Sequence, residues 1–176
     1  MKVLETIKKR RSIREFSDQI ISDEDLNTIL QAAMCGPSAV NSRDWQFIVV
    51  RDKDTLNKMA DCNGVAAKPL RNANVGILVC ADTSRSYSGA PEYYAVNCSI
   101  ATQNILLQAR ELGIGSVWLG TWPQSQKVNN LKNLFSLPEN IIPHSLIALG
   151  YPKNISELEL GCRSTFDPNL IHYEKW

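Results

Sequence analysis

The sequence has few of the residues from which metal and nucleophile sites are built. Its 176 residues include only two histidines, His144 and His172, which lie 28 positions apart with no carboxylate cluster beside them. Such a pair makes a poor metal site. The G-x-S-x-G, H-E-x-x-H and phosphate-loop lysine motifs are also missing, as is a G-x-G-x-x-G turn after a strand. These absences argue against the usual hydrolases and nucleotide folds, and we expect each histidine to be structural or exposed.

The cysteines lack the pattern of a disulfide framework or a metal site. They are Cys35, Cys62, Cys80, Cys98 and Cys162, an odd number with no C-x-x-C pair. The flanks of Cys35, Cys80 and Cys98 are apolar. We therefore interpret the cysteines as reduced, mostly buried thiols in a reducing compartment.

The sequence also has almost no net charge and no long apolar run. The formal charge is +1, from 19 Lys and Arg against 18 Asp and Glu, which gives no global basic field for nucleic acid. No stretch approaches the ~18 apolar residues of a membrane span, and the start, MKVLETIKKRR, has no apolar signal core. The length suits one domain, 1–176, and we expect a cytoplasmic protein without nucleic-acid or membrane partners.

The charge that is present is unevenly placed. Residues 1–16 hold six Lys or Arg and two Glu, a sum of +4. Within RRSIR, an extended backbone would put Arg10, Ser12 and Arg14 on one side, where guanidinium groups could bind a phosphate in bidentate fashion. A solvated basic helix end, with cations complementing the helix dipole, fits the pattern equally well. The segment is a candidate anion site.

Apolar periodicity and capping signals predict alternating helices and strands. Helices are predicted at 3–9, from Ser22 to Gly36-Pro37, from Asp52 or Asp54 to about Asp61, from Pro91 to Leu112, and at 124–135. Strands are predicted at 46–51, 75–81, 116–120 and 145–151. The helix before Leu112 has few polar residues and is expected to be central. The pattern indicates an α+β or α/β fold with helices on both faces of a sheet.

The last segment, 152–176, has no clear period yet is rich in apolar residues. These are Leu158, Leu160, Phe166, Ile171, Tyr173 and Trp176. A structureless segment of ~25 residues is uncommon in a compact domain. At ~3.3 Å per residue it could reach ~80 Å, which favours wrapping around a partner subunit. The alternative is a tail that folds back on its own domain.

Two further segments could contact a ligand. GPSAVNSRDW at 36–45 has small residues that permit close approach of a planar ligand, and Asn41 can both donate and accept. GSVWLGTW at 115–122 ends a strand at Gly120-Thr121, where backbone N–H groups could face a ligand. The alternatives are a plain connection with Trp45 as a core residue and a buried strand with a glycine turn.

Taken in order, four segments resemble the nitroreductase family of FMN-dependent oxidoreductases. They are KKRRSIREF at 8–16, GPSAVNSRDWQFIVV at 36–50, ARELGIGSVWLGTW at 109–122 and LIALGYP at 146–152. FDPNLIHYEKW at 166–176 resembles the tail of short members. The resemblance implies an α+β homodimer with a central mixed β-sheet flanked by helices, C-terminal segments exchanged between the chains, and two FMN molecules at the interface.

The resemblance also implies the roles of individual residues. Arg10, Ser12 and Arg14 would bind the FMN phosphate, ribityl chain and pyrimidine edge, with Arg11 adding a contact. Pro37, Ser38, Ala39 and Asn41 would line the flavin, at least partly from the other subunit. Gly120 and Thr121, with Leu119, would place backbone N–H groups near flavin N5 and O4. Arg163 falls where the family often has a basic phosphate ligand.

Two departures from the family concern the substrate side. Arg43-Asp44-Trp45 stands where the family commonly has Gln-Pro-Trp, which would put a charge pair near the site. The stretch from Thr83 to Ala90 replaces a sizeable insertion of long members, so we expect a more open pocket.

By resemblance, NADH or NADPH would reduce FMN and leave, and a nitroaromatic, quinone or similar acceptor would use the same face in a ping-pong cycle. FMN carries the chemistry, and no catalytic side chain is expected. The alternatives are another reaction of the same fold (dehalogenation, flavin fragmentation or dehydrogenation), or a flavin-binding regulatory or sensor module without turnover.

Overall fold

The computed structural model describes residues 2–161 and 166–176. The helices are α1 (Val3–Lys9), α2 (Asp23–Met34), α3 (Lys53–Asn63), α4 (Tyr93–Glu111) and α5 (Ser125–Phe135). The strands are β1 (Trp45–Val50), β2 (Val75–Asp82), β3 (Gly115–Gly120) and β4 (Ile141–Gly150). Short 3-10 turns are η1 (Ala39–Asn41), η2 (Val65–Asn72), η3 (Ile155–Leu158) and η4 (Pro168–Leu170).

The predicted helix starts are confirmed by side-chain caps. Ser22 Oγ accepts the Asp25 N–H at the start of α2, and Asp52 accepts the Thr55 N–H at the start of α3. Each cap satisfies a backbone donor that the first helical turn leaves without a partner. Local capping chemistry therefore suffices to place both helices in the chain.

The four strands form one sheet in the order β1-β2-β4-β3, and every ladder is antiparallel. The prediction of a mixed sheet is wrong for these strands. After β1, α3 carries the chain away and η2 brings it back, so β2 begins beside the end of β1, with Val50 paired to Gly76. The one parallel pairing in the described residues is an isolated bridge between Ser12 and Ser116.

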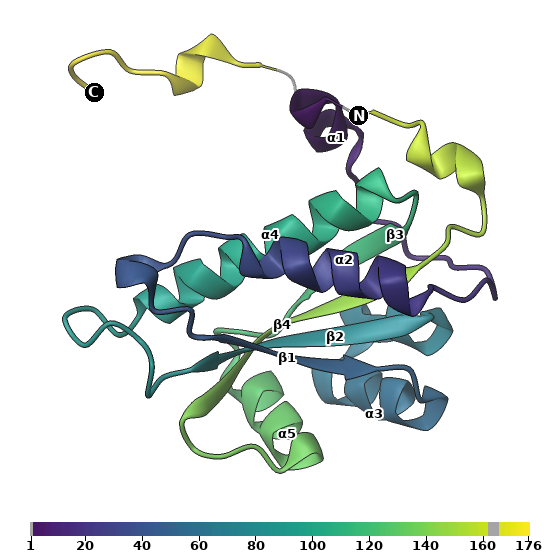
Figure 1. Ribbon diagram of the computed structural model, residues 1–176, viewed down its shortest axis with the longest axis horizontal. Helices are drawn as coiled ribbons and strands as arrows, with labels where there is room; N and C mark the ends of the chain where they lie inside the picture. Colours follow the sequence, from purple (N-terminus) through teal and green to yellow (C-terminus); the bar gives the residue numbers. More distant parts are fainter. Residues whose placement is uncertain (1, 162–165) are drawn as a thin grey trace.

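Helices cover both faces of the sheet, as predicted, and the α+β class is confirmed. Figure 1 shows α2 and α4 on one face and α3 and α5 on the other. Neighbouring residues of β2 point to opposite faces, so Ile77 packs under α2 and α4 whereas Leu78 packs against α3 and α5. This alternation makes two separate apolar cores from one fully apolar strand. No helix in the described residues is long and apolar enough to cross a membrane.

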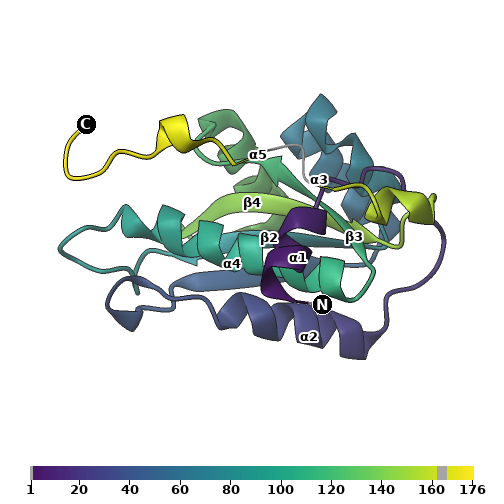
Figure 2. The ribbon, with the colours of Figure 1, turned by 90° about the horizontal axis from the view of Figure 1, so that it is seen from above.

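The tail divides into two parts. The Lys153 N–H donates to the Glu15 carbonyl at 3.0 Å, and Leu158 is buried, so the first part folds back on its own domain. Residues 166–176 are exposed throughout and extend away from the body, as Figures 1 and 2 show. Wrapping of a partner stays a prediction, and it now concerns this second part.

The cysteines are less uniformly buried than predicted. Cys80 and Cys98 are buried, and burial raises the pKa of Cys80 to about 12 and that of Cys98 still further. Cys62 is half-buried. Cys35 is exposed because it caps the C-terminal end of α2, where the chain turns away from the core. Cys162 lies outside the described residues.

Candidate functional site

The segment 10–16 is fastened to the sheet by two apolar side chains. Ile13 and Phe16 are buried, and each lies over a glycine of the neighbouring strands. A Cβ atom at Gly115 would meet Ile13 Cγ2 at 2.8 Å, and one at Gly150 would meet Phe16 Cβ at 2.8 Å. Only glycine therefore leaves room for the segment to lie this close to β3 and β4.

The basic side chains of this segment remain available for a ligand. The helix ends at Lys9, and Arg10 has extended backbone angles, so the interpretation as a helix end is wrong from Arg10 onward. Arg14 is exposed, and Arg10 and Arg11 are half-buried. Across ranges 2–161 and 166–176, these three guanidinium groups form no ion pair. A cluster of unpaired cations is suited to a phosphate.

A cavity of about 280 Å³ lies between this segment and η2. Its polar lining is two cations, Arg14 and Lys68, with one anion, Glu15, and Asn72; its apolar lining is Val65, Ala66 and Pro69. Cations next to an apolar wall suit a flat ring system that carries negative charge. Sequence reasoning missed Lys68 because η2 has no period or motif that distinguishes it from a loop.

The end of β3 exposes backbone, as the pattern at 115–122 suggested. Gly120 is exposed, and a Cβ added there would meet no atom within 4 Å. Leu119 and Thr121 on either side are buried, so the exposed surface at this strand end is that of Gly120. Gly120 lies four residues along β3 from Ser116, the partner of Ser12, a span of ~13 Å at ~3.3 Å per residue. One strand thus connects the basic segment to the exposed glycine.

The loop 36–44 has a strained backbone. Val40, Asn41 and Arg43 all have positive φ, at 49°, 57° and 48°. Such angles are costly for residues with a Cβ and persist only when surrounding contacts hold them. Two bonds lie within the loop: Ser38 Oγ accepts the Arg43 N–H at 3.0 Å, and Arg43 Nε donates to Asn41 Oδ1 at 2.9 Å. The strain marks this loop as a candidate binding element.

Buried polar side chains fasten the loop to α4. Asn97 Oδ1 accepts the Ala39 N–H at 3.1 Å, and Asn97 Nδ2 donates to both carboxylate oxygens of Asp44 at 3.0 and 3.1 Å. Ser86 Oγ also donates to Asp44 at 2.9 Å. Of the two charges predicted near the site, Arg43 is exposed, whereas Asp44 is buried and bonded to Asn97 and Ser86. Asp44 is thus a structural anchor.

Within one chain, the loop 36–44 and the segment 10–16 lie at opposite ends of α4. The loop contacts Asn97, whereas Arg110 Nε donates to the Lys9 carbonyl just before the basic segment, at 3.3 Å. Arg110 lies thirteen positions after Asn97 in α4, which is ~20 Å at ~1.5 Å per residue. The structure therefore keeps Pro37, Ser38, Ala39 and Asn41 away from Arg10 and Ser12 of the same chain.

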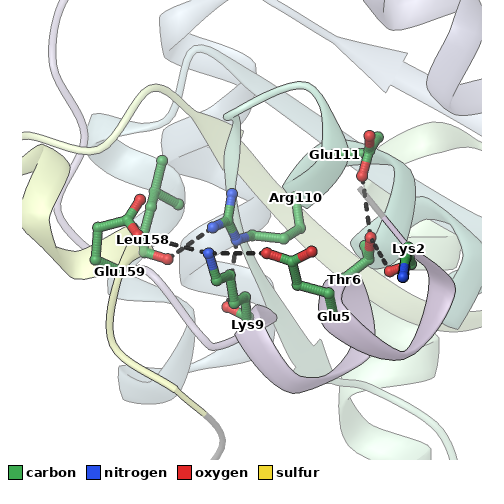
Figure 3. Close-up of polar contacts among 8 residues, drawn as sticks. All are labelled: Lys2, Glu5, Thr6, Lys9, Arg110, Glu111, Leu158 and Glu159. Atoms are coloured by element: carbon green, nitrogen blue, oxygen red, sulfur yellow. Dashed lines mark hydrogen bonds and ion pairs between the residues drawn. The ribbon is translucent and has the colours of Figure 1, made fainter.

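A buried arginine, Arg110, connects the end of α1 to η3 near the basic segment. Arg110 Nη2 donates to the Leu158 carbonyl at 2.7 Å, in addition to its bond to Lys9, as Figure 3 shows. Lys9 also pairs with Glu5 at 3.1 Å and Glu159 at 3.7 Å. Sequence reasoning missed Arg110, whose place at the end of a helix signals only a dipole partner. It positions α1 and η3 together.

The remaining predicted groups are structural or lie elsewhere. His144 is buried and stacks on Trp122 at 5.8 Å between ring centroids, and burial lowers its pKa to about 4. His172 is exposed and stacks on Trp176. Both histidines therefore match the prediction. No group of three His, Cys, Asp or Glu able to hold a metal occurs in the described ranges. Arg163 lies outside them.

Comparisons with known proteins identify the family. The family model described as "Nitroreductase family" matches residues 7–69 and 63–151. A protein of Methanothermobacter thermautotrophicus, provisionally named NADH dehydrogenase/NAD(P)H nitroreductase, is 47% identical over 176 residues, covering 100% of this chain and 88% of its own.

Two solved structures also match over nearly the whole length. A Parabacteroides distasonis protein with the same provisional name is 32% identical, with a TM-score of 0.90 and coverage of 100% of this chain and 99% of its own. A Desulfovibrio desulfuricans protein provisionally named a nitroreductase, solved in complex with FMN, is 29% identical with a TM-score of 0.78 and coverage of 100% of this chain and 98% of its own. The chain therefore belongs to the nitroreductase family.

Proposed function

We propose that this protein is an FMN-dependent oxidoreductase that takes reducing equivalents from NADH or NADPH and passes them to a nitroaromatic, a quinone or a similar acceptor in a ping-pong cycle. Family membership and the names of the relatives support the reaction class. The observation that carries the proposal is the set of unpaired cations at 10–14 beside a cavity lined by Arg14 and Lys68.

The residues present fit FMN in charge and shape. Arg10, Ser12 and Arg14 would hold the phosphate, the ribityl chain and the pyrimidine edge of the ring, with Arg11 adding a contact. The cavity beside η2 has an apolar wall suited to a ring, and the backbone at Gly120 is open to a ligand. Leu119 and Thr121 would contribute their backbone. This donor set matches an anionic group linked to a flat, polar-edged ring.

The complete site would need two chains. Because ~20 Å of α4 separates the loop 36–44 from the segment 10–16, Pro37, Ser38, Ala39 and Asn41 would line the flavin held by the other copy. Large apolar side chains of the second tail part are exposed in the single chain, namely Phe166, Leu170, Tyr173 and Trp176. A second copy that binds these side chains would bury them. We therefore propose a homodimer with exchanged tails.

FMN, when bound, supplies the hydride chemistry, and this chain's residues bind and orient it. Arg14 and Lys68 would place positive charge beside the ring, which favours the negatively charged reduced form and raises the reduction potential. The predicted site residues include no histidine, cysteine or carboxylate, so their part would be to bind and orient the cofactor. The short connection between β2 and α4 leaves the substrate side open, which suits flat acceptors of varied size.

A spectrum and a rapid-mixing experiment test the proposal. Purified protein should be yellow and carry one FMN per chain, and anaerobic mixing with NADH or NADPH should bleach it rapidly. A nitroaromatic or quinone should then restore the colour. In an Arg14→Ala variant we expect less bound FMN and a lower midpoint potential. Stable yellow colour without bleaching would instead identify a flavin-binding module without turnover, and a colourless protein that takes up no added FMN would refute the proposal.

A further inference from the structure

Arg110 binds the backbone of the basic segment's start and of the tail at the same time. It is 7% exposed, lies in the last turn of α4, and donates to the carbonyl oxygens of Lys9 and Leu158 at 3.3 and 2.7 Å (Figure 3). Lys9 directly precedes the basic segment, and Leu158 ends η3 in the first part of the tail, residues 152–161. One buried side chain therefore connects these two segments.

The first part of the tail follows the basic segment in the opposite direction. Phe16 forms an antiparallel bridge with Pro152, and the Lys153 N–H donates to the Glu15 carbonyl at 3.0 Å. Five positions after Lys153 the tail reaches Arg110, beside the other end of the segment. The tail thus holds the segment at both ends, directly at one end and through Arg110 at the other.

The peptide between Lys9 and Arg10 is fixed on both sides. Its carbonyl accepts from Arg110, and its N–H donates to the Thr6 carbonyl at 2.9 Å. The backbone changes here from helical to extended, with φ −66° and ψ 131° at Arg10. Because a planar peptide sets the direction in which the chain continues, Arg110 determines where the extended basic segment starts.

Arg110 is a buried cation that depends on both segments. It forms no ion pair within residues 2–161 and 166–176, and a guanidinium cannot lose its proton in a protein. Burial of such a group is costly unless its donors are satisfied. The two carbonyls and the negative end of the α4 dipole satisfy it only while both segments are in place. The position of the basic segment is therefore coupled to that of the tail.

We propose that Arg110 is a positioning residue for the FMN phosphate, which orients the start of the segment 10–14 and makes its placement depend on the attached tail. The inference rests on the proposed function, which puts the phosphate against this segment. Arg110 acts through the residues that hold the phosphate rather than by touching the ligand. Loss of Arg110 should therefore remove affinity for the phosphate and leave affinity for the ring unchanged.

Riboflavin, which has the same ring without the phosphate, separates the two contributions. Arg110→Met should weaken FMN binding about tenfold, measured by quenching of flavin fluorescence, and leave riboflavin binding unchanged. Arg51→Met is the matched control. In the part of the chain that the structure describes, Arg51 bonds to the Ile21 carbonyl and to Asp23, and to neither the basic segment nor the tail. Its loss should change stability without changing the ratio of FMN to riboflavin affinity.

Two further variants separate position from charge and from folding. Arg110→Lys keeps the charge, but one ammonium group replaces the planar fork that reaches two carbonyls, so the loss should persist. Leu158→Ala removes the buried side chain that seats the tail and should also weaken FMN binding. Combined with Arg110→Met it should add nothing, because both changes break the same connection. Circular dichroism checks that each variant is folded.

The outcomes separate the inference from the proposed function. Weaker FMN binding in Arg110→Met, Arg110→Lys and Leu158→Ala, at constant riboflavin affinity, would support the inference. Equal losses for FMN and riboflavin, an unchanged FMN affinity, or full recovery in Arg110→Lys would overturn it and leave the proposed function standing. A wild-type chain that binds no added FMN would overturn both.

A second readout serves if riboflavin binds too weakly to compare. The phosphorus NMR resonance of bound FMN should shift in Arg110→Met and stay at its wild-type position in Arg51→Met. Identical spectra for wild type and Arg110→Met would overturn the inference, because the phosphate would then be held equally well without Arg110.

Discussion

The two halves of the candidate site are fastened by opposite means. The segment 10–16 is held by apolar side chains, Ile13 and Phe16, that lie over glycines of the sheet. The loop 36–44 is held by buried polar groups, Asp44 and Asn97. Apolar anchors consume no hydrogen-bonding groups, so the arginines of the first half remain available for an anion. Polar anchors have direction, and so they can hold the left-handed backbone of the second half in one shape.

The largest effect is expected when the dimer that would bring the two halves of the site together cannot form. Removal of residues 166–176 should abolish both dimer formation and FMN retention, because each half would then face solvent. Light scattering and the visible spectrum measure the two effects. A chain with the residues 166–176 in shuffled order is the matched control for length and composition, and should behave like the truncated chain. A truncated dimer with full FMN content would contradict the exchange.

The apolar anchor should respond most to loss of volume. Ile13→Ala should lower the free energy of unfolding by about 4 kcal/mol, since Ile13 is 1% exposed and truncation leaves a cavity. Ile20→Ala is the control, because Ile20 is 74% exposed and should change stability by less than about 0.5 kcal/mol. Urea denaturation measures both. A loss near zero for Ile13→Ala would show that backbone bonds alone hold the segment.

The polar anchor should respond to loss of an acceptor. Asp44→Ala should cost about 2–3 kcal/mol, because the buried Asn97 amide keeps only its 3.3 Å bond to Ser42 and the half-buried Ser86 hydroxyl loses its acceptor, and a buried group left unsatisfied costs about 1–3 kcal/mol. Asp44→Asn keeps one acceptor oxygen and should cost less. Thermal and urea unfolding measure stability, and hydrogen exchange at Ala39 reports on the loop. Equal stability of Asp44→Ala and wild type would show that the loop holds its shape unaided.

Acid should weaken the end of α4 that carries the polar anchor. Burial lowers the pKa of His144 to about 4, and its ring lies 3.4 Å from Ser99 Oγ, two residues from Asn97. The unfolded chain, with an ordinary histidine pKa of ~6.5, binds the proton more readily, so stability falls as pH drops below ~6.5 and levels off near 4.

The expected loss between pH 7.5 and pH 5 is about 2 kcal/mol, at ~1.4 kcal/mol per pH unit. His144→Phe keeps a ring for stacking on Trp122 and removes the titration. Urea unfolding across this pH range should therefore be flatter in the variant. Parallel profiles for the two proteins would show that His144 does not carry the acid sensitivity.

Much of the fold follows from local patterns. Ser22 and Asp52 mark the starts of α2 and α3, and the apolar run at 75–81 marks β2, because caps and periodicity act over a few residues. The alternation in RRSIR likewise predicts that Ile13 lies on the opposite side of the segment from Arg10, Ser12 and Arg14. Each of these signals depends on residues close together in the chain.

The partners of those elements could not be predicted in this way. The antiparallel pairing of β1 and β2 depends on the course of η2, and the sequence of η2 has no distinctive pattern. Lys68 lines the cavity because it lies in that turn. Asp44 reads as a charge beside the site until Asn97, 53 residues away, is seen to bind it. Long-range pairing is decided by packing of the whole chain.

The sequence by itself determined the secondary structure, the basic segment and the resemblance to a flavoprotein family, since these rest on local chemistry. Only the tertiary structure decided that the segment 10–16 and the loop 36–44 lie apart within one chain. It also decided which side chains bind the Gly120 carbonyl. The physical reason is that a hydrogen bond such as that between Asn63 and Gly120 joins residues 57 positions apart, whose proximity exists only once the sheet and helices have packed.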